Sequence, residues 1–350
     1  VLGERSRFEN AGRLLGLFGP RTPLQDSVGI ITPSALHFMA AHGYDPPDLD
    51  PRQHRLLIHG LVDRPLIFTL EDLKCLPSVS RIHFLECGGN TTPSTWKSRD
   101  ATVQETHGYT GCSEWTGVPL SVLLQEAGLQ KGAGWLVAEG AEPGKHAKSF
   151  PMEKVMADVL VAYGQNGEAL RPEQGYPFRL VVPGWVGINN VKWLRRIKVV
   201  DQFYSTKWET AGYANMRRDG KAHRQLEMGP KSVITRPSGG QRLPGRGFYE
   251  ITGLAWSGWG AIRRVEVSTD GGRTWKDAHL QEPVHRMAHA RFRFPWTWNG
   301  EEAVLQSRST DELGQVQPTL AEFSGIWGVN LDFWLSTSGH VINNFNPIQP

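Results

Sequence analysis

One cysteine stands where a short strand gives way to a glycine turn. Cys87 follows the alternating segment 81–86 (RIHFLE) and is itself followed by Gly88, Gly89 and Asn90. Ligands commonly bind at the carboxyl ends of strands in open sheets, and a thiolate there is a good ligand for a soft metal. A buried, inert thiol is the more common fate of a free cysteine. The motif alone leaves both interpretations open.

A second candidate is a glycine-rich loop between two basic residues. The segment 178–183 (FRLVVP) reads as a buried strand and leads into Gly184 and Gly187, and Arg179 and Lys192 lie on either side of the loop. Glycines let backbone N–H groups approach an anion closely, and the two cations could hold it. Solvated surface charge explains the pattern nearly as well.

The elements that must position these residues fall into two groups. The first half alternates strands with short helices: strands are expected over 55–60, 81–86, 135–139, 178–183 and 191–200, and helices over 70–76, 119–127 and from 151. Thr69 is the expected N-cap of the first helix, with Asp72 at its third position. From Ser232 onward the strands are short and regularly spaced, one of them over 276–279, and Asp270–Gly271 marks a hairpin turn, a pattern typical of a β-sandwich. The sequence therefore predicts an α+β chain.

Chain length supports this division, because 350 residues exceed the roughly 250–300 at which a single core stops growing. Residues 1–50 contain frequent Gly and Pro and are expected to be irregular. We expect an N-terminal extension over 1–30, a mixed α/β domain over 31–228, a sandwich domain over 229–335 and a C-terminal tail over 336–350. A net charge of +3 argues against nucleic acid as a partner. No apolar run approaches the roughly 18 residues of a membrane span.

The three cysteines do not form a disulfide framework, and the sequence contains no Cys-x-x-Cys-His, so no haem is expected on this chain. The opening segment lacks the continuous apolar core of a secretory signal. We expect that a signal peptide was removed.

Several ordered motifs together resemble the sulfite oxidase family of molybdenum enzymes. They are the segments 84–90 (FLECGGN), 175–197 (GYPFRLVVPGWVGINNVKWLRRI), 54–60, 230–237 and 265–275. The resemblance covers roughly residues 30–335. It implies a sulfite-oxidase-type molybdopterin-binding domain followed by an immunoglobulin-like dimerisation domain, with a molybdenum–molybdopterin cofactor.

The resemblance also assigns roles to individual residues. Cys87 matches the cysteine that ligates molybdenum, and Tyr213 aligns with the active-site tyrosine. The remaining matches bind the pterin, with Gln174 standing where the family commonly has a histidine: Phe38, Met39, His42, Glu142, Gln174, Arg179, Asn190, Val191 and Lys192.

Two departures bear on the substrate. Thr91–Thr92 stand where sulfite-oxidising members usually carry two arginines, and Ala40–Ala41 stand where they usually carry Arg-Asn. Because bidentate arginine is the preferred holder of a small oxyanion, their loss argues against free sulfite.

Within the family, the motif around Cys87 most resembles the molybdenum subunit of the bacterial Sox sulfane dehydrogenase. This implies a periplasmic α2β2 enzyme that oxidises a sulfane sulfur carried on a carrier-protein cysteine and passes electrons to a c-type cytochrome subunit. Two alternatives remain open. One is a sulfite dehydrogenase that acts on free sulfite. The other is a non-catalytic binding protein, which would hold no metal and would leave the Cys87 motif unexplained.

Overall fold

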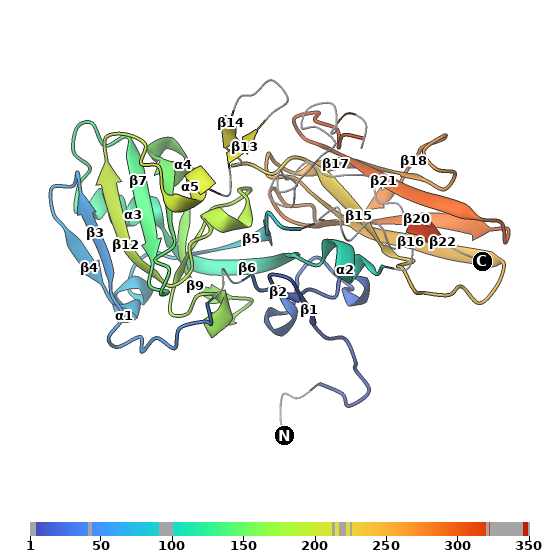
Figure 1. Ribbon diagram of the computed structural model, residues 1–350, viewed down its shortest axis with the longest axis horizontal. Helices are drawn as coiled ribbons and strands as arrows, with labels where there is room; N and C mark the ends of the chain where they lie inside the picture. Colours follow the sequence, from blue (N-terminus) through green and yellow to red (C-terminus); the bar gives the residue numbers. More distant parts are fainter. Residues whose placement is uncertain are drawn as a thin grey trace.

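The computed structural model describes residues 5–40, 44–90, 101–211, 214–216, 222–224, 226–319, 322 and 346–348. The described chain forms two parts that lie side by side along the long axis, a mixed α/β part and a β-sandwich (Figure 1). Among the described residues, no helix has the length and apolar character needed to cross a membrane.

Two five-stranded sheets build the first part. One has the order β4 (Leu66–Phe68), β3 (Leu56–Gly60), β12 (Leu194–Val200), β7 (Trp135–Gly140) and β8 (Ala147–Pro151), with β3 and β12 parallel. The other has the order β10 (Glu168–Ala169), β9 (Leu160–Gln165), β6 (Thr110–Pro119) and β5 (Val79–Glu86), while β11 (Arg179–Val181) also pairs with β9. The strand β6, the longest of this part among the described residues, was not predicted from the sequence.

Short helices accompany these sheets. They are α1 (Leu70–Lys74), α2 (Val103–His107), α3 (Leu120–Ala127), α4 (Met152–Asp158) and α5 (Lys207–Ala211), with the 3-10 turns η4 (Pro172–Gln174) and η5 (Gly187–Asn189). The helix predicted over 70–76 is confirmed. It begins at a capping box in which Thr69 and Asp72 each accept the other's backbone N–H.

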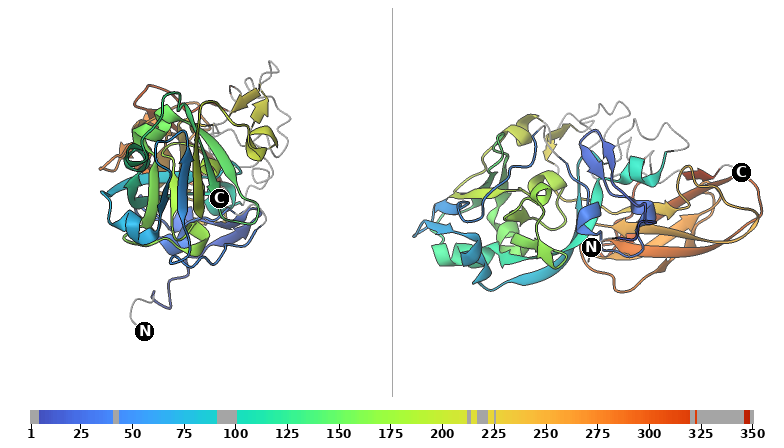
Figure 2. Two further views of the ribbon diagram at one scale, coloured as in Figure 1. Left: turned by 90° about the vertical axis from the view of Figure 1, so that its left-hand side faces the viewer. Right: turned by 90° about the horizontal axis from the view of Figure 1, so that it is seen from below.

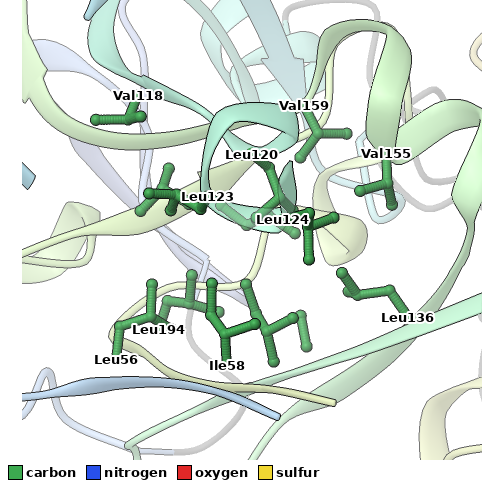
Figure 3. Close-up of a cluster of buried hydrophobic side chains, with 14 of the residues drawn as sticks. Leu56, Ile58, Val118, Leu120, Leu123, Leu124, Leu136, Val155, Val159 and Leu194 are labelled. Carbon is green, nitrogen blue, oxygen red and sulfur yellow. The ribbon is translucent and has the colours of Figure 1, made fainter. Parts of the chain in front are cut away.

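The apolar face of α3 forms the centre of the core in this part. Leu120, Leu123 and Leu124 are fully buried and belong to one cluster with Leu56 and Ile58 of β3 (Figure 3). Each such side chain contributes roughly 1.5–3 kcal/mol relative to an exposed one. This core fixes the two sheets that carry the candidate residues.

The second part is the predicted immunoglobulin-like β-sandwich. One sheet has the order β15 (Lys231–Arg236), β16 (Gly247–Trp256), β20 (Ala290–Trp298) and β19 (His279–Leu280). The other has the order β18 (Lys276–Asp277), β17 (Ile262–Ser268), β21 (Ala303–Asp311) and β22 (Asn346–Ile348). The single strand expected over 276–279 is wrong: β18 pairs with β17 and β19 with β20, so the chain crosses between the sheets at Ala278.

The N-terminal segment is more ordered than the irregular stretch expected from its glycines and prolines. It contains the hairpin β1 (Leu14–Gly16) and β2 (Gly19–Arg21) and the turns η1 (Leu24–Asp26) and η2 (Ser34–Leu36), and β1 and β2 lie near the middle of the molecule (Figures 1 and 2). The Thr22 N–H donates to the Gly108 carbonyl, and the Arg291 guanidinium donates to the Gly29 carbonyl. The segment thus contacts both parts of the chain. A further hairpin, β13 (Ala214–Met216) with β14 (Ala222–Arg224), precedes the sandwich.

Candidate functional site

A pocket of about 770 Å³, part of it open to solvent, gathers most of the predicted site residues. Its wall is formed by residues 38–40 and Tyr44, the end of β5, the loop after β7, the η4–β11 segment and the connection from η5 to β12. The predicted residues that line it are Phe38, Met39, Cys87, Glu142, Gln174, Arg179, Asn190 and Lys192. Segments far apart in the sequence thus converge on one cavity.

The thiol of Cys87 is held at the end of β5 by backbone contacts. The Cys87 N–H donates to the Tyr109 carbonyl at 2.9 Å, and the Gly89 N–H points to Cys87 Sγ at 3.4 Å. Burial raises the pKa of the Cys87 thiol to about 11, against the opposing effects of the Gly89 N–H and the Lys192 charge. A soft metal cation would favour the thiolate directly, because a coordinated thiol is deprotonated.

Arg179 is a buried cation on β11. Its guanidinium donates to the carbonyls of Gln174 at 2.9 Å and Asn190 at 3.1 Å, and it lies 5.1 Å from the Trp115 ring centroid. Within the described part of the chain, no carboxylate forms an ion pair with it. Burial lowers the pKa of Arg179 to about 9. Because an uncompensated buried charge is costly, this position is suited to a bound anion.

Lys192 supplies a second cation to the same wall. Its ammonium donates to the carbonyls of Ala40 at 3.2 Å and Glu173 at 3.1 Å, and it lies 4.5 Å from the Trp193 ring centroid. Burial, followed by the Arg179 charge, lowers the pKa of Lys192 to about 7. An anion bound beside both groups would hold them protonated.

Two buried polar atoms in the pocket have no hydrogen-bond partner among the described residues: Glu142 Oε2 and Asn190 Nδ2. The other ends of these side chains are fixed, since Glu142 Oε1 accepts the His146 N–H at 2.5 Å and Asn190 Oδ1 accepts the Val182 N–H at 2.7 Å. Burial also raises the pKa of Glu142. Most buried polar atoms are satisfied, so an acceptor and a donor left open in one pocket fit a polar heterocycle.

Gln174 connects two of these pieces. Its Nε2 donates to the Phe38 carbonyl at 2.8 Å, and its Oε1 accepts from Arg179 Nη1 at 3.3 Å. The residue that stands where the family commonly has a histidine therefore joins the segment around Phe38 to the buried guanidinium.

Val191 is the one predicted residue, among those that the structure describes, that does not line the pocket. Val191 packs in the apolar core, and its carbonyl accepts the Leu180 N–H at 2.8 Å. His42 and Tyr213 lie outside the described residues, as do Ala41 and the pair Thr91–Thr92.

The structure adds pocket residues that the sequence did not suggest, notably His146 and Tyr44. The imidazole Nε2 of His146 lies 2.8 Å from the Ile188 carbonyl, which joins the loop after β7 to η5. The only sequence signal was its position four residues after Glu142.

Comparisons with known proteins identify the family of this chain. Residues 42–208 match the family model of the oxidoreductase molybdopterin binding domain, and residues 222–338 match that of the Mo-co oxidoreductase dimerisation domain. The chain belongs to the sulfite oxidase family of molybdenum oxidoreductases. Its cofactor is accordingly molybdenum–molybdopterin.

Several family members are similar over most of this chain. A Brassica napus NADH nitrate reductase is 35% identical over 308 residues, or 77% of this chain and 33% of that protein. Mouse mitochondrial sulfite oxidase is 31% identical over 340 residues, or 87% of this chain and 61% of that protein. The chain thus spans only about a third of this nitrate reductase's length. The crystal structure of the sulfane dehydrogenase SoxCD from Paracoccus pantotrophus is 40% identical with a TM-score of 0.92, covering 98% of this chain and 89% of that chain.

The pocket's chemistry fits the family's cofactor. A buried thiol offers a soft ligand for molybdenum, two cations suit the pterin phosphate, and the open atoms of Glu142 and Asn190 suit the polar edge of a pterin.

Proposed function

We propose that Cys87 ligates molybdenum in this pocket and that Arg179 and Lys192 hold the pterin phosphate. Glu142 and Asn190 would bind the polar edge of the pterin through their open Oε2 and Nδ2 atoms. Gln174 would orient Arg179 and the segment that wraps the cofactor, formed by Phe38, Met39 and His42. Val191 would act indirectly. Its carbonyl accepts the Leu180 N–H, and this hydrogen bond fixes the positions of its chain neighbours Asn190 and Lys192.

The proposed reaction is the oxidation of a sulfane sulfur carried on a cysteine of a carrier protein. When bound, the cofactor supplies oxygen-atom transfer and two-electron redox chemistry. In the first two-electron step a persulfide R–S–S⁻ and one water give R–S–SO⁻, two protons and two electrons. The protein's task is to exclude competing reactions and to present the sulfur, and Tyr213 would hydrogen-bond the sulfur–oxygen group.

The observation that carries this proposal is the nature of the pocket's cations. Ala40 lines the pocket where sulfite-oxidising members usually carry an arginine. The guanidinium of Arg179 already donates to backbone carbonyls beside the proposed phosphate position. A free dianion would lack a bidentate clamp. A sulfur on a carrier needs none, because contacts between the two proteins position it and raise its effective concentration.

The partners follow from the resemblance to sulfane dehydrogenase and are part of the proposal. A c-type cytochrome subunit would accept the electrons in the periplasm, and the sandwich would form a two-fold homodimer, giving α2β2. The likeness to SoxCD supports this assembly. Sedimentation of the full chain without the cytochrome should give twice the mass of one chain, and a monomer at micromolar concentration would remove the dimer from the proposal.

Steady-state kinetics on two substrates tests the reaction. Free sulfite and a carrier protein bearing a cysteine persulfide are each supplied to the holoenzyme with a c-type cytochrome as acceptor. We expect efficient turnover with the loaded carrier and little with sulfite. Efficient sulfite oxidation with no response to the loaded carrier would favour the alternative, a sulfite dehydrogenase, which the similarity to mouse sulfite oxidase also supports.

A further inference from the structure

The end of β5 has two chemically different faces. Successive side chains of a strand point to opposite sides, so Leu85 and Cys87 line the pocket while Phe84 and Glu86 face away from it. On that far side Glu86 is 1% exposed and meets the β-sandwich. The residue next to the proposed metal ligand therefore belongs to the boundary between the two parts of the chain.

Both carboxylate oxygens of Glu86 are held by the sandwich. Lys231 Nζ donates to Oε1 at 2.6 Å, and Trp256 Nε1 donates to Oε2 at 2.7 Å. Lys231 on β15 and Trp256 on β16 are direct partners in the sheet register, and they are 1% and 0% exposed. The two donors thus come from a rigid, fully buried pair of strands.

The same carboxylate also fixes the turn after Cys87. Asn90 Nδ2 donates to Glu86 Oε1 at 2.9 Å, while Asn90 Oδ1 accepts the Tyr109 N–H at 3.0 Å. The Asn90 N–H closes the turn onto the Cys87 carbonyl at 3.0 Å. Glu86 and Asn90 therefore clamp Cys87 from both sides, and the clamp is anchored in the sandwich.

We propose that Glu86 is a positioning residue for the metal ligand, through which Lys231 and Trp256 of the sandwich fix the place of the Cys87 sulfur. The inference rests on the proposed ligand role of Cys87. It gives the second domain a part in the active site in addition to dimerisation. Outer-shell partners of this kind commonly change metal affinity or activity by about 10–100-fold when removed.

Stability alone is a weak reason for this ion pair. Replacing a buried ion pair by apolar or neutral groups of similar volume is often neutral or stabilising, whereas removing one partner is strongly destabilising. The double variant Glu86→Gln/Lys231→Met removes both charges together and should therefore fold, although the single amide oxygen introduced by Glu86→Gln can accept from only one of the donors Asn90 and Trp256. Any change at the metal would then report on position rather than on unfolding.

The experiment compares the purified holoenzyme with this double variant by X-ray absorption at the molybdenum K edge, which reports the number and distance of sulfur ligands. Turnover per bound molybdenum is measured alongside. We expect an altered sulfur shell and a turnover per molybdenum lower by about 10–100-fold.

A matched control is the buried pair Lys148 and Glu209, 2% and 6% exposed, changed to Lys148→Met/Glu209→Gln. The control should leave the sulfur shell unchanged.

Three outcomes separate the possibilities. An unchanged sulfur shell and a turnover within about twofold of wild type would overturn the positioning role. If Cys87→Ser also keeps the wild-type sulfur shell, the ligand role itself fails. Should the double variant not fold, Trp256→Phe decides, because it keeps an aromatic ring at the contact with Phe84 and removes the donor to Glu86 together with one ring of the indole. It should shift the sulfur shell in the same direction, and an unchanged spectrum overturns the proposal.

Discussion

Two buried polar clusters lie on opposite faces of the same strand end, and they differ in how completely their charges are matched. Behind β5, both oxygens of Glu86 have donors, and its charge is balanced by Lys231. In the pocket, Arg179 has only carbonyl acceptors, and Glu142 Oε2 lacks a partner among the described residues. The matched cluster holds two domains together, and the unmatched cluster is arranged for a ligand that supplies the missing charge and hydrogen bonds.

The difference shows why burial alone does not identify a functional site. Both clusters are deeply buried and both contain ionisable groups, but only one leaves its polar atoms open. An unsatisfied buried polar atom costs about 1–3 kcal/mol. A fold that keeps several in one pocket is stabilised when the ligand binds.

The largest expected effect is the loss of turnover when Cys87, on the pocket face of the strand end, is replaced. Cys87→Ser should fold but lower turnover by more than about 100-fold, beyond the range typical of outer-shell partners, because a serine hydroxyl is a poor substitute for a soft thiolate. The assay is steady-state turnover with the loaded carrier. Cys75→Ser changes an exposed thiol and should retain wild-type turnover. Wild-type turnover in Cys87→Ser would rule out the ligand role.

The matched cluster around Glu86 should show its effect in the free energy of unfolding. Glu86→Gln alone removes the carboxylate that pairs with the buried Lys231 ammonium, so the free energy of unfolding should fall by about 3–5 kcal/mol. The double variant Glu86→Gln/Lys231→Met should lose only about 1–3 kcal/mol, because no charge is left unpaired and one donor, Asn90 or Trp256, loses its acceptor. Urea unfolding of the cofactor-free chain measures both. Equal losses in the single and double variants would show that the ion pair is not what couples these residues.

Removing the Arg179 cation should weaken cofactor binding while leaving the free energy of unfolding nearly unchanged. Arg179→Met should reduce the retention of cofactor by about 10–100-fold. The free energy of unfolding of the cofactor-free chain should change by less than about 1 kcal/mol, because losing the uncompensated charge offsets the lost hydrogen bonds. Molybdenum content and urea unfolding are the two readouts. The control Arg291→Met removes a buried arginine that binds the N-terminal segment and should leave molybdenum content unchanged.

The patterns that were predicted from the sequence are those encoded within a few residues. The capping box at Thr69 is one example, and the strand running into Cys87 is another. The glycine loop between Arg179 and Lys192 is also local, and both cations line the pocket. Local spacing sets the backbone path, which suffices to bring these groups to one cavity once the sheets form.

What escaped prediction depends on contacts between distant segments. Lys231 and Trp256 lie 145 and 170 positions from Glu86, and nothing near Glu86 in the sequence marks it as their partner. The crossing at Ala278 depends on which sheet each half of the segment meets. His146 is similar, because its contact with the Ile188 carbonyl exists only after β7 and η5 come together.

The smallest expected effect concerns pH at the domain boundary. Burial, with smaller contributions from Arg291 and His37, lowers the pKa of His289 to about 3, whereas an unfolded histidine titrates near 6.5. Between these values the unfolded chain binds more protons, so this group's contribution to stability is complete above about pH 6.5 and is lost as the pH falls toward 3.

His289→Gln should flatten the acid limb by up to about 1.4 kcal/mol per pH unit. Urea unfolding of the cofactor-free chain from about pH 7 to about pH 4 measures the slope. The exposed His279→Gln serves as the control, and its acid limb should match that of wild type. The same slope in His289→Gln and wild type would assign the acid sensitivity to other groups.

The central claim is that the open polar cluster around Cys87 holds molybdenum and a pterin. It is tested most directly by the metal and pterin content of the purified chain, measured by plasma mass spectrometry and by fluorescence of the oxidised pterin, after expression in a host that makes the cofactor. The account predicts one molybdenum and one pterin per chain, with the metal greatly reduced in Arg179→Met. A wild-type chain that is folded and dimeric but carries neither metal nor pterin would contradict it and favour a binding protein without a cofactor.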